Sequence, residues 1–178
     1  MLSFLLRTEC TWDGLDALPS ETASVSVDEN DSGVALGIDA PYHEDPAPKG
    51  VAGSLWELWE WEVVELFILG KDERYLEIEV GPHGHYLALR LHGERNIIDH
   101  GHALNVDVQI SGDRWTGQID VPARLLPEKP WRVNAYAIHG TGDERRYLAS
   151  FAVPGPHPDY HRLAYFRNVD ELTKDIAS

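Results

Sequence analysis

Apolar side chains recur at every second position in one segment after another of this 178-residue chain. A period of two is that of a β-strand, and the turns between the segments are rich in Gly, Asp and Ser, as they are in hairpins. At least eight short strands, spaced by about ten residues, predict an all-β protein with an antiparallel, jelly-roll-like β-sandwich fold. The pattern is clearest in four strand pairs, at 25–38, 62–80, 104–121 and 132–153.

A helical pattern is found at the carboxyl end of the chain. The stretch "NVDELTKDIA" puts Val169, Leu172 and Ile176 on one face, and it begins with Asn168, a favourable N-cap residue. We therefore expect a short C-terminal helix. The chain length and its 43% hydrophobic content suit one core better than two. This predicts a single domain over residues 1–178.

Charge limits the partners that such a chain can bind. The formal net charge is −15, so the long-range field would repel nucleic acids and anionic membranes and would favour neutral or cationic small molecules. Cys10 is the only cysteine, which leaves no internal disulfide and suits a reducing compartment. The apolar run in "MLSFLLRTEC" is too short for a signal peptide, and no run approaches the roughly 20 apolar residues of a membrane span. We expect a cytoplasmic protein.

The stretch "LWELWEWEVVELFIL" raises the question of a binding site. It carries three tryptophans within six positions, Trp56, Trp59 and Trp61. They could pack as core at one end of the sandwich, or they could form the wall of a site. The Pro/Gly-rich loop at 40–54 must end beside them. Glu65 lies in a strand that is otherwise apolar on both faces, so its carboxylate needs a partner, either an arginine or a ligand.

Other polar side chains can be placed by strand alternation. In the strand "HYLALRL", Leu87, Leu89 and Leu91 share one face. If such leucine faces form the core, certain polar residues must project from the opposite faces. Such a face is either plain solvated surface or a shallow binding surface. The residues concerned are Glu77, Glu79, Arg90, Gln118, Asp120 and Asn134.

Several stretches of the chain resemble a known family along nearly its whole length. They include "DAPYHEDPAPKG", "LWEWEVVELF", "YLEIEVGPHGHYL", "GERN", "AIHG" and "PDYHRLAYF". They resemble an uncharacterised family typified by the human chromosome 4 open reading frame 33 protein, which implies no particular activity. More distantly, their order is similar to the family 9 carbohydrate-binding modules and to DOMON-like domains. That resemblance implies a non-catalytic β-sandwich that binds sugars between two aromatic side chains.

The distant resemblance also implies site residues. In those modules a Trp stands six residues before the Glu of a "vElF" strand and both touch the sugar, a spacing that falls here on Trp59 and Glu65. Tyr160 occupies the place of a second aromatic that is usually Trp. A contacting Arg is replaced by Glu77 or Glu79, which suggests that the scaffold is kept while the ligand has changed. The underlying physics is general, because a pyranose stacks its C–H face on an indole while carboxylates accept its hydroxyls.

Histidines offer a competing interpretation. His83 and His85, like His100 and His102, have an H-x-H spacing that puts two imidazoles on one strand face. If His83 and the histidines at 139 and 161 converge near a glutamate, they could hold a metal that activates water, or act as an acid/base pair.

The sequence thus favours a ligand-binding β-sandwich for a carbohydrate or polyol. The alternatives are a hydrolase built on the same Glu and His residues, including a paired-carboxylate glycosidase, and a protein-interaction domain. No cofactor is predicted, since haem ligation by Met and His, known in some DOMON-like domains, cannot be built with Met1 as the only methionine. The predicted ligand-binding residues are Trp59, Glu65, Glu77, Glu79, His83, His139, Tyr160 and His161.

Overall fold

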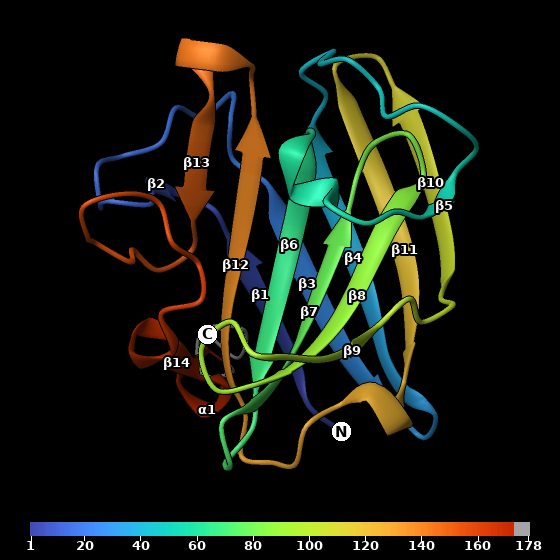
Figure 1. The fold of residues 1–178 in the computed structure, drawn as a ribbon, viewed down its shortest axis with the longest axis vertical. Coiled ribbons are helices and arrows are strands. Elements are labelled where there is room, and N and C mark those ends of the chain that lie inside the picture. The colour runs from blue at the N-terminus through green and yellow to red at the C-terminus, as the bar shows by residue number, and fades with distance from the viewer. Residues whose placement is uncertain (173–178) are drawn as a thin grey trace.

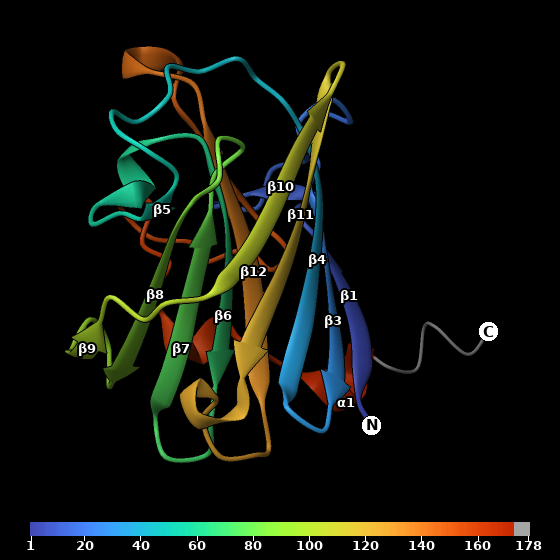
Figure 2. The same ribbon diagram turned by 90° about the vertical axis from the view of Figure 1, so that its right-hand side faces the viewer.

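A computed structural model describes residues 1–172, which form two β-sheets packed face to face (Figures 1 and 2). The smaller sheet has five antiparallel strands. Their order is β1 (Ser3–Arg7), β3 (Ser24–Asn30), β4 (Gly33–Pro41), β11 (Arg114–Pro122) and β10 (Asn105–Ser111).

The larger sheet has nine strands, of which seven form a continuous path. The path is β2 (Cys10–Thr11), β13 (Arg146–Ala149), β12 (Arg132–His139), β6 (Val63–Leu69), β7 (Arg74–Val80), β8 (His85–His92) and β5 (Gly53–Ser54). Two short strands pair at its sides, β14 (Arg167–Asn168) with β12 and β9 (Ile97–His100) with β8. Within residues 1–172, every strand pairing is antiparallel except that of β5 with β8. The predicted all-β antiparallel sandwich is confirmed.

The two clearest hairpins have the predicted registers. Val27 lies opposite Leu36 in the β3–β4 pair, and Val106 lies opposite Ile119 in the β10–β11 pair. The core between the sheets is filled by the inward residues of these strands and of β6, β7 and β12, with Trp115 only 1% exposed.

One face assignment was wrong. Leu87 and Leu89 of β8 point away from the sandwich core, into a second apolar cluster on the outer face of the nine-stranded sheet, while Tyr86 and Ala88 face the sandwich core. Both faces of this sheet are covered, so an apolar residue follows another apolar residue and alternation does not reveal which one faces the other sheet.

The same covering buries polar residues that alternation alone would leave exposed. Glu77, Glu79 and Asn134 are at most 3% exposed on the outer face of the nine-stranded sheet. On the five-stranded sheet, Gln118 and Asp120 are exposed.

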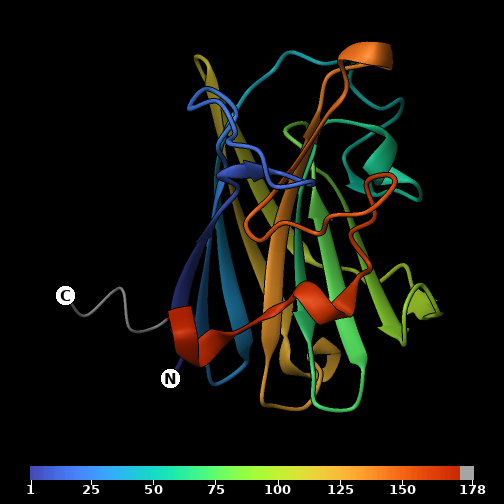
Figure 3. The same ribbon diagram turned by 90° about the vertical axis from the view of Figure 1, so that its left-hand side faces the viewer.

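The cover of the outer face is largely the segment after β13, which crosses the strands and includes the 3-10 turn η4 (Leu163–Tyr165) (Figure 3). Asn134 fixes its start, because the amide nitrogen donates to the Phe151 carbonyl at 2.8 Å and the amide oxygen accepts from the Phe151 N–H at 3.0 Å.

Three further 3-10 turns and one helix complete the described chain. The turns are η1 (Leu58–Glu60), η2 (Ala123–Leu125) and η3 (Gly142–Glu144). The C-terminal helix α1 spans Val169–Leu172, and both of these residues pack on the sandwich core as predicted. Ile176 lies outside the described residues. No helix within residues 1–172 is long and apolar enough to cross a membrane.

The loop between β4 and β5 lies on the surface without regular structure and leads to the tryptophans, as predicted. Glu62 anchors it, since its buried carboxyl accepts from the N–H groups of His43 and Asp45 at 3.0 and 3.4 Å. The Asp45 carboxylate in turn accepts from the N–H of Gly140 at 2.6 Å.

Candidate functional site

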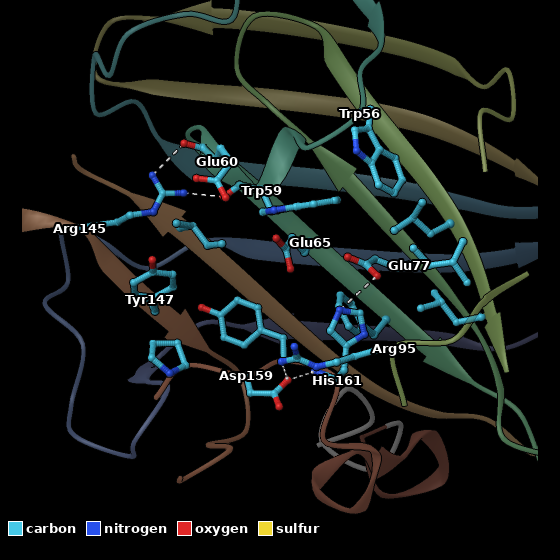
Figure 4. Close-up of a pocket in the computed structure, with 17 residues that line it drawn as sticks. Trp56, Trp59, Glu60, Glu65, Glu77, Arg95, Arg145, Tyr147, Asp159 and His161 are labelled. Atoms are coloured by element: carbon cyan, nitrogen blue, oxygen red, sulfur yellow. Dashed lines mark hydrogen bonds and ion pairs between the residues drawn. The ribbon is translucent and has the colours of Figure 1, made fainter. Parts of the chain in front are cut away.

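A cavity of about 440 Å³ opens on the outer face of the nine-stranded sheet (Figure 4). Strands β6, β7 and β8 form its floor. The turn that contains η1 forms one wall, and residues 158–161 form the wall across from it. The turn between β8 and β9, the residue before β13 and the first part of β13 complete the rim. Segments distant in the sequence therefore meet at one site.

The first wall is aromatic. The rings of Trp56 and Trp59 meet edge to face with centroids 5.3 Å apart. Trp56 also lies 4.9 Å from the ring of His100, and it is 45% exposed, whereas Trp59 is half-buried against the outer apolar cluster. The wall therefore offers flat apolar surface to a ligand in the cavity.

The floor carries three buried carboxyl groups, Glu65, Glu77 and Glu79, called here the carboxyl triad. Glu65 on β6 lies directly opposite Glu79 on β7, and Glu77 is two residues earlier on the same face of β7. Their exposed fractions are 2%, 3% and 0%. Glu65 and Glu77 line the cavity, and Glu79 lies beside them without lining it.

Few hydrogen bonds or ion pairs compensate the burial of the carboxyl triad. Oε2 of Glu77 and both carboxyl oxygens of Glu79 have no hydrogen-bond partner among residues 1–172. Within the same residues, the ion pairs include only one contact with the triad, from Nε2 of His161 to Oε2 of Glu77 at 3.9 Å. Of the two partners considered for Glu65, an arginine is thus not in ion-pair contact with it, and the carboxyl is buried.

Burial raises the pKa of all three groups, and repulsion between carboxylates adds to the rise for Glu65 and Glu79. Burial raises the pKa of Glu77 from 4.5 to about 7. Burial, and then the neighbouring Glu77, raise the pKa of Glu65 well above its ordinary value, and burial with the other two carboxylates does the same for Glu79. Protonation is therefore the way in which the floor avoids three buried like charges.

His161 is held as a neutral ring above Glu77. Its Nδ1 lies 2.7 Å from the hydroxyl of Tyr75, which itself accepts from the N–H of Arg95 at 3.1 Å. The hydroxyl proton is then directed at Nδ1, which assigns the ring proton to Nε2 on the side of Glu77. Burial, and then the charge of Arg95, lower the pKa of His161 to about 4, so the ring is neutral at physiological pH.

Two arginines at the rim are already engaged. The guanidinium of Arg145 donates to the carbonyl oxygens of Trp59 at 2.5 Å and of Glu60 at 3.0 Å, which ties the aromatic wall to the turn after β12. Nη2 of Arg95 lies 2.6 Å from a carboxylate oxygen of Asp159. Both cations therefore organise the rim without forming an ion pair with the carboxyl triad, and the charge of Arg145 only partly offsets the raised pKa of Glu65.

Tyr160 lines the cavity, but one face of its ring is covered. It stacks on Tyr136 with centroids 3.7 Å apart and ring planes at 9°. Its hydroxyl donates to the Leu148 carbonyl at 3.1 Å, and the residue is 8% exposed. Tyr160 thus offers an edge and part of one face to the cavity.

Two predicted site residues lie elsewhere. The ring centroid of His83 lies 5.8 Å from that of Tyr42. The ring of His139 stacks on that of His43 with centroids 3.6 Å apart, and its Nε2 lies 3.2 Å from a carboxylate oxygen of Glu21. The three histidines at 83, 139 and 161 therefore do not converge. Within residues 1–172, no group of three or more His, Cys, Asp and Glu side chains is arranged to hold a metal ion.

The structure also adds residues that sequence reasoning did not assign to the site: Trp56, Arg95, Arg145, Tyr147 and Asp159. Arg95 and Asp159 lie in the stretches "GERN" and "PDYH", which carried the family resemblance, so a signal was present for them. Nothing in the local sequence distinguished Arg145, because its role depends on carbonyl groups more than 80 residues away in the chain.

The fold is a two-sheet antiparallel β-sandwich with a cavity on the outer face of its larger sheet. A crystal structure of a proposed carbohydrate-binding protein from Bacteroides uniformis matches it with a TM-score of 0.72, over 92% of this chain and 84% of that one, at 14% identity. At this identity the likeness shows the shared fold alone. It confirms the fold predicted from the sequence.

Comparison with curated sequences identifies the family. UPF0462 protein C4orf33 homolog of Rattus norvegicus is 39% identical over 170 residues, covering 90% of this chain and 85% of the relative. The human UPF0462 protein C4orf33 is 37% identical over 171 residues, which cover 91% of this chain and 85% of the relative. The Danio rerio homolog is 36% identical over 167 residues, which cover 89% of this chain and 84% of the relative. The chain therefore belongs to the UPF0462 family typified by C4orf33, as predicted. No protein-family profile matches it.

Proposed function

We propose that this protein is a non-catalytic binding module whose cavity takes a carbohydrate or a similar polyol. The observation that carries the proposal is the juxtaposition of an exposed indole wall with buried carboxyl groups on the floor of one cavity. The cavity volume of about 440 Å³ lies within the range of roughly 300–1,000 Å³ that is common for small-molecule sites.

A sugar ring matches this arrangement physically. Its apolar C–H face can stack on Trp56 or Trp59, which takes apolar surface out of water. Its hydroxyls can donate to unpartnered carboxyl oxygens, above all Oε2 of Glu77, and can accept from the Nε2–H of His161. A buried polar atom without a partner costs free energy, so a hydroxyl that reaches Glu77 removes a penalty as well as adding a contact.

The experiment is a titration of the full chain with a panel of mono- and oligosaccharides, followed by intrinsic tryptophan fluorescence and calorimetry. Trp59→Ala is expected to weaken binding by about tenfold or more, since it removes the stacking surface. Trp59→Phe keeps an aromatic ring and should lose less. Trp12→Phe, which alters a tryptophan outside the cavity, is the matched control.

Saturable binding that depends on Trp59 but not on Trp12 supports the proposal. The proposal is refuted if no sugar binds to folded protein, or if Trp59→Ala binds every recognised sugar as tightly as the unaltered chain. Circular dichroism of each variant shows that any loss comes from the site and not from unfolding.

A glycoside hydrolase is the second candidate, on one specific observation. The pKa of Glu77 is raised to about 7 by burial, which is the property of a general acid that works near neutral pH, and Glu65 lies on the neighbouring strand. Turnover of aryl glycosides that is lost in Glu77→Gln would favour this candidate. Tight binding without turnover favours the binding module.

A further inference from the structure

Three buried carboxylates would require positive charge, and the residues around the carboxyl triad do not supply it. Arg145 is bound to backbone carbonyls and Arg95 to Asp159, as described above. His161 is neutral because its Nδ1 faces the Tyr75 hydroxyl in a buried position. Across residues 1–172, no Lys or Arg forms an ion pair with Glu65, Glu77 or Glu79.

The positions of the three carboxyl groups make the lack of positive charge more costly. Glu65 and Glu79 are directly opposed across two neighbouring strands, a position in which like charges destabilise a sheet. Glu77 shares their face of β7, and its Oε2 is buried, unpartnered and part of the cavity lining. Buried carboxylates are normally paired with a cation or bound to a metal. The unpartnered oxygen of Glu77 therefore marks the place where a positive group belongs.

We infer that the ligand carries a protonated amine that binds against Glu77 and Glu65, so that the cavity is selective for an amino sugar over a neutral sugar. This inference rests on the proposed function and narrows its ligand class. The ammonium would donate one N–H bond to the ionised carboxylate of Glu77 and another to a carboxyl oxygen of Glu65, which keeps its proton, while the sugar ring would stack on Trp56 or Trp59.

Other features of the molecule agree with a cationic ligand. The net charge of −15 draws cations toward the surface and repels anionic ligands. An ammonium beside the indole of Trp59 would also gain a cation–π attraction. A metal ion is a poorer fit for the positive group, because the carboxyl triad and its described neighbours do not form a metal-binding group.

Binding of the amine has a defined proton balance. No covalent bond changes, and the ammonium keeps its three protons. A carboxyl group that is protonated in the free protein must release its proton to the buffer before it can pair with the ammonium. A neutral sugar, whose hydroxyls can bind a protonated or an ionised carboxyl, does not require this release. Proton release is therefore the signature that separates the two ligand classes.

The experiment is calorimetry with D-glucosamine, D-glucose and N-acetyl-D-glucosamine at about pH 6.5, where an amino group with a pKa of about 7.7–8.0 is charged. Titrations in two buffers of different ionisation enthalpy give the number of protons released. We expect glucosamine to bind at least tenfold more tightly than the other two and to release about one proton, because Glu77 is largely protonated below a pKa of about 7.

Variants test the residues. Glu77→Gln should remove the preference for glucosamine and the proton release, and Glu65→Gln should reduce both. Asp107→Asn also removes one carboxylate, but on an exposed position of β10 in the other sheet, and it should keep both properties.

The outcomes separate the two proposals. Equal affinity for glucosamine and glucose, or binding of glucosamine without proton release, overturns the inference and leaves the polyol-binding function standing. Failure of every sugar in the panel to bind overturns both. A preference for glucosamine that survives in Glu77→Gln refutes the assignment of the amine to this carboxyl group.

Discussion

Replacing Glu77 by glutamine is expected to stabilise the protein above neutral pH and to leave its stability near pH 4.5 almost unchanged. The carboxyl group has an ordinary pKa of 4.5, and burial raises it to about 7 in the folded chain. Between these two pH values the folded protein holds a proton that the unfolded chain has lost. The free energy of unfolding therefore falls as the pH rises through this window and levels off above it.

The magnitude follows from the width of the window. The interval from 4.5 to about 7, at about 1.4 kcal/mol for each pH unit, amounts to about 3 kcal/mol. Glutamine has nearly the same shape and does not ionise, so Glu77→Gln should escape this loss. The variant should also lower the repulsion that Glu77 exerts on Glu65, which acts in the same direction.

The assay is urea unfolding followed by far-ultraviolet circular dichroism, at several values from about pH 5 to about pH 8. The quantity to plot is the stability of the variant minus that of the unaltered chain. Groups such as Glu62, with its pKa raised to about 7, and His43, with its pKa lowered to about 4, change the stability of both proteins and cancel in the difference.

The expected difference is small at pH 5 and grows to about 3 kcal/mol at pH 8. Asp107→Asn, at an exposed position, should give a difference that is flat with pH. A flat difference for Glu77→Gln as well would refute the reasoning, because it would mean that the folded carboxyl group ionises as it does in the unfolded chain.

Three further changes test how the site is supported. Asn134→Ala removes both hydrogen bonds to Phe151, and we expect urea titration to show a loss of about 2–4 kcal/mol in unfolding free energy. Glu62→Gln replaces an oxygen that accepts from a loop N–H by a donor, so limited proteolysis within residues 41–52 should become faster. Gly33 has a φ of +148°, and Gly33→Ala adds a methyl group 2.0 Å from the backbone oxygen of Val121. The melting temperature should therefore fall by about 10 °C.

Two of these changes have a control variant. Gln118→Ala changes an exposed amide on the other sheet and should cost less than about 0.5 kcal/mol. Gly53→Ala introduces a methyl group with nothing within 4 Å at a φ of +145°, so it isolates the backbone strain of this φ from the clash at Gly33. Equal melting temperatures for the two glycine variants would show that the clash is relieved without cost. Unchanged proteolysis of Glu62→Gln would show that the loop is held by other contacts.

The sandwich was predictable because its signals are local. The hairpin registers around residues 30–33 and 111–114 follow from alternation and turn residues within a few positions of each other. The position of Trp59 and Glu65 on one cavity could be anticipated from the spacing that the distant sugar-binding resemblance supplied, and the structure brings both to that cavity.

The remaining site features depend on contacts that no local pattern encodes. The segment after β13 folds back over the outer face without strands of its own until β14, so nothing in the strand "YLEIEV" reveals that Glu77 and Glu79 are buried. The same cover turned Leu87 and Leu89 of β8 away from the expected core. His139 was predicted to bind the ligand but stacks on His43, which the loop after β4 brings to its side of the sheet.

Stability and ligand choice meet in the same carboxyl groups. A glutamine at position 77 would fill the same space without the cost that ionisation imposes above pH 7, so packing alone gives no reason for a glutamate there. Proteins commonly keep such costs where a binding site requires them. The two effects of Glu77→Gln must then occur together: the variant gains stability at pH 8 and loses its preference for an amine. If the variant gained stability but kept its preference for an amine, Glu77 would only destabilise the floor, and another group on the cavity wall would bind the amine.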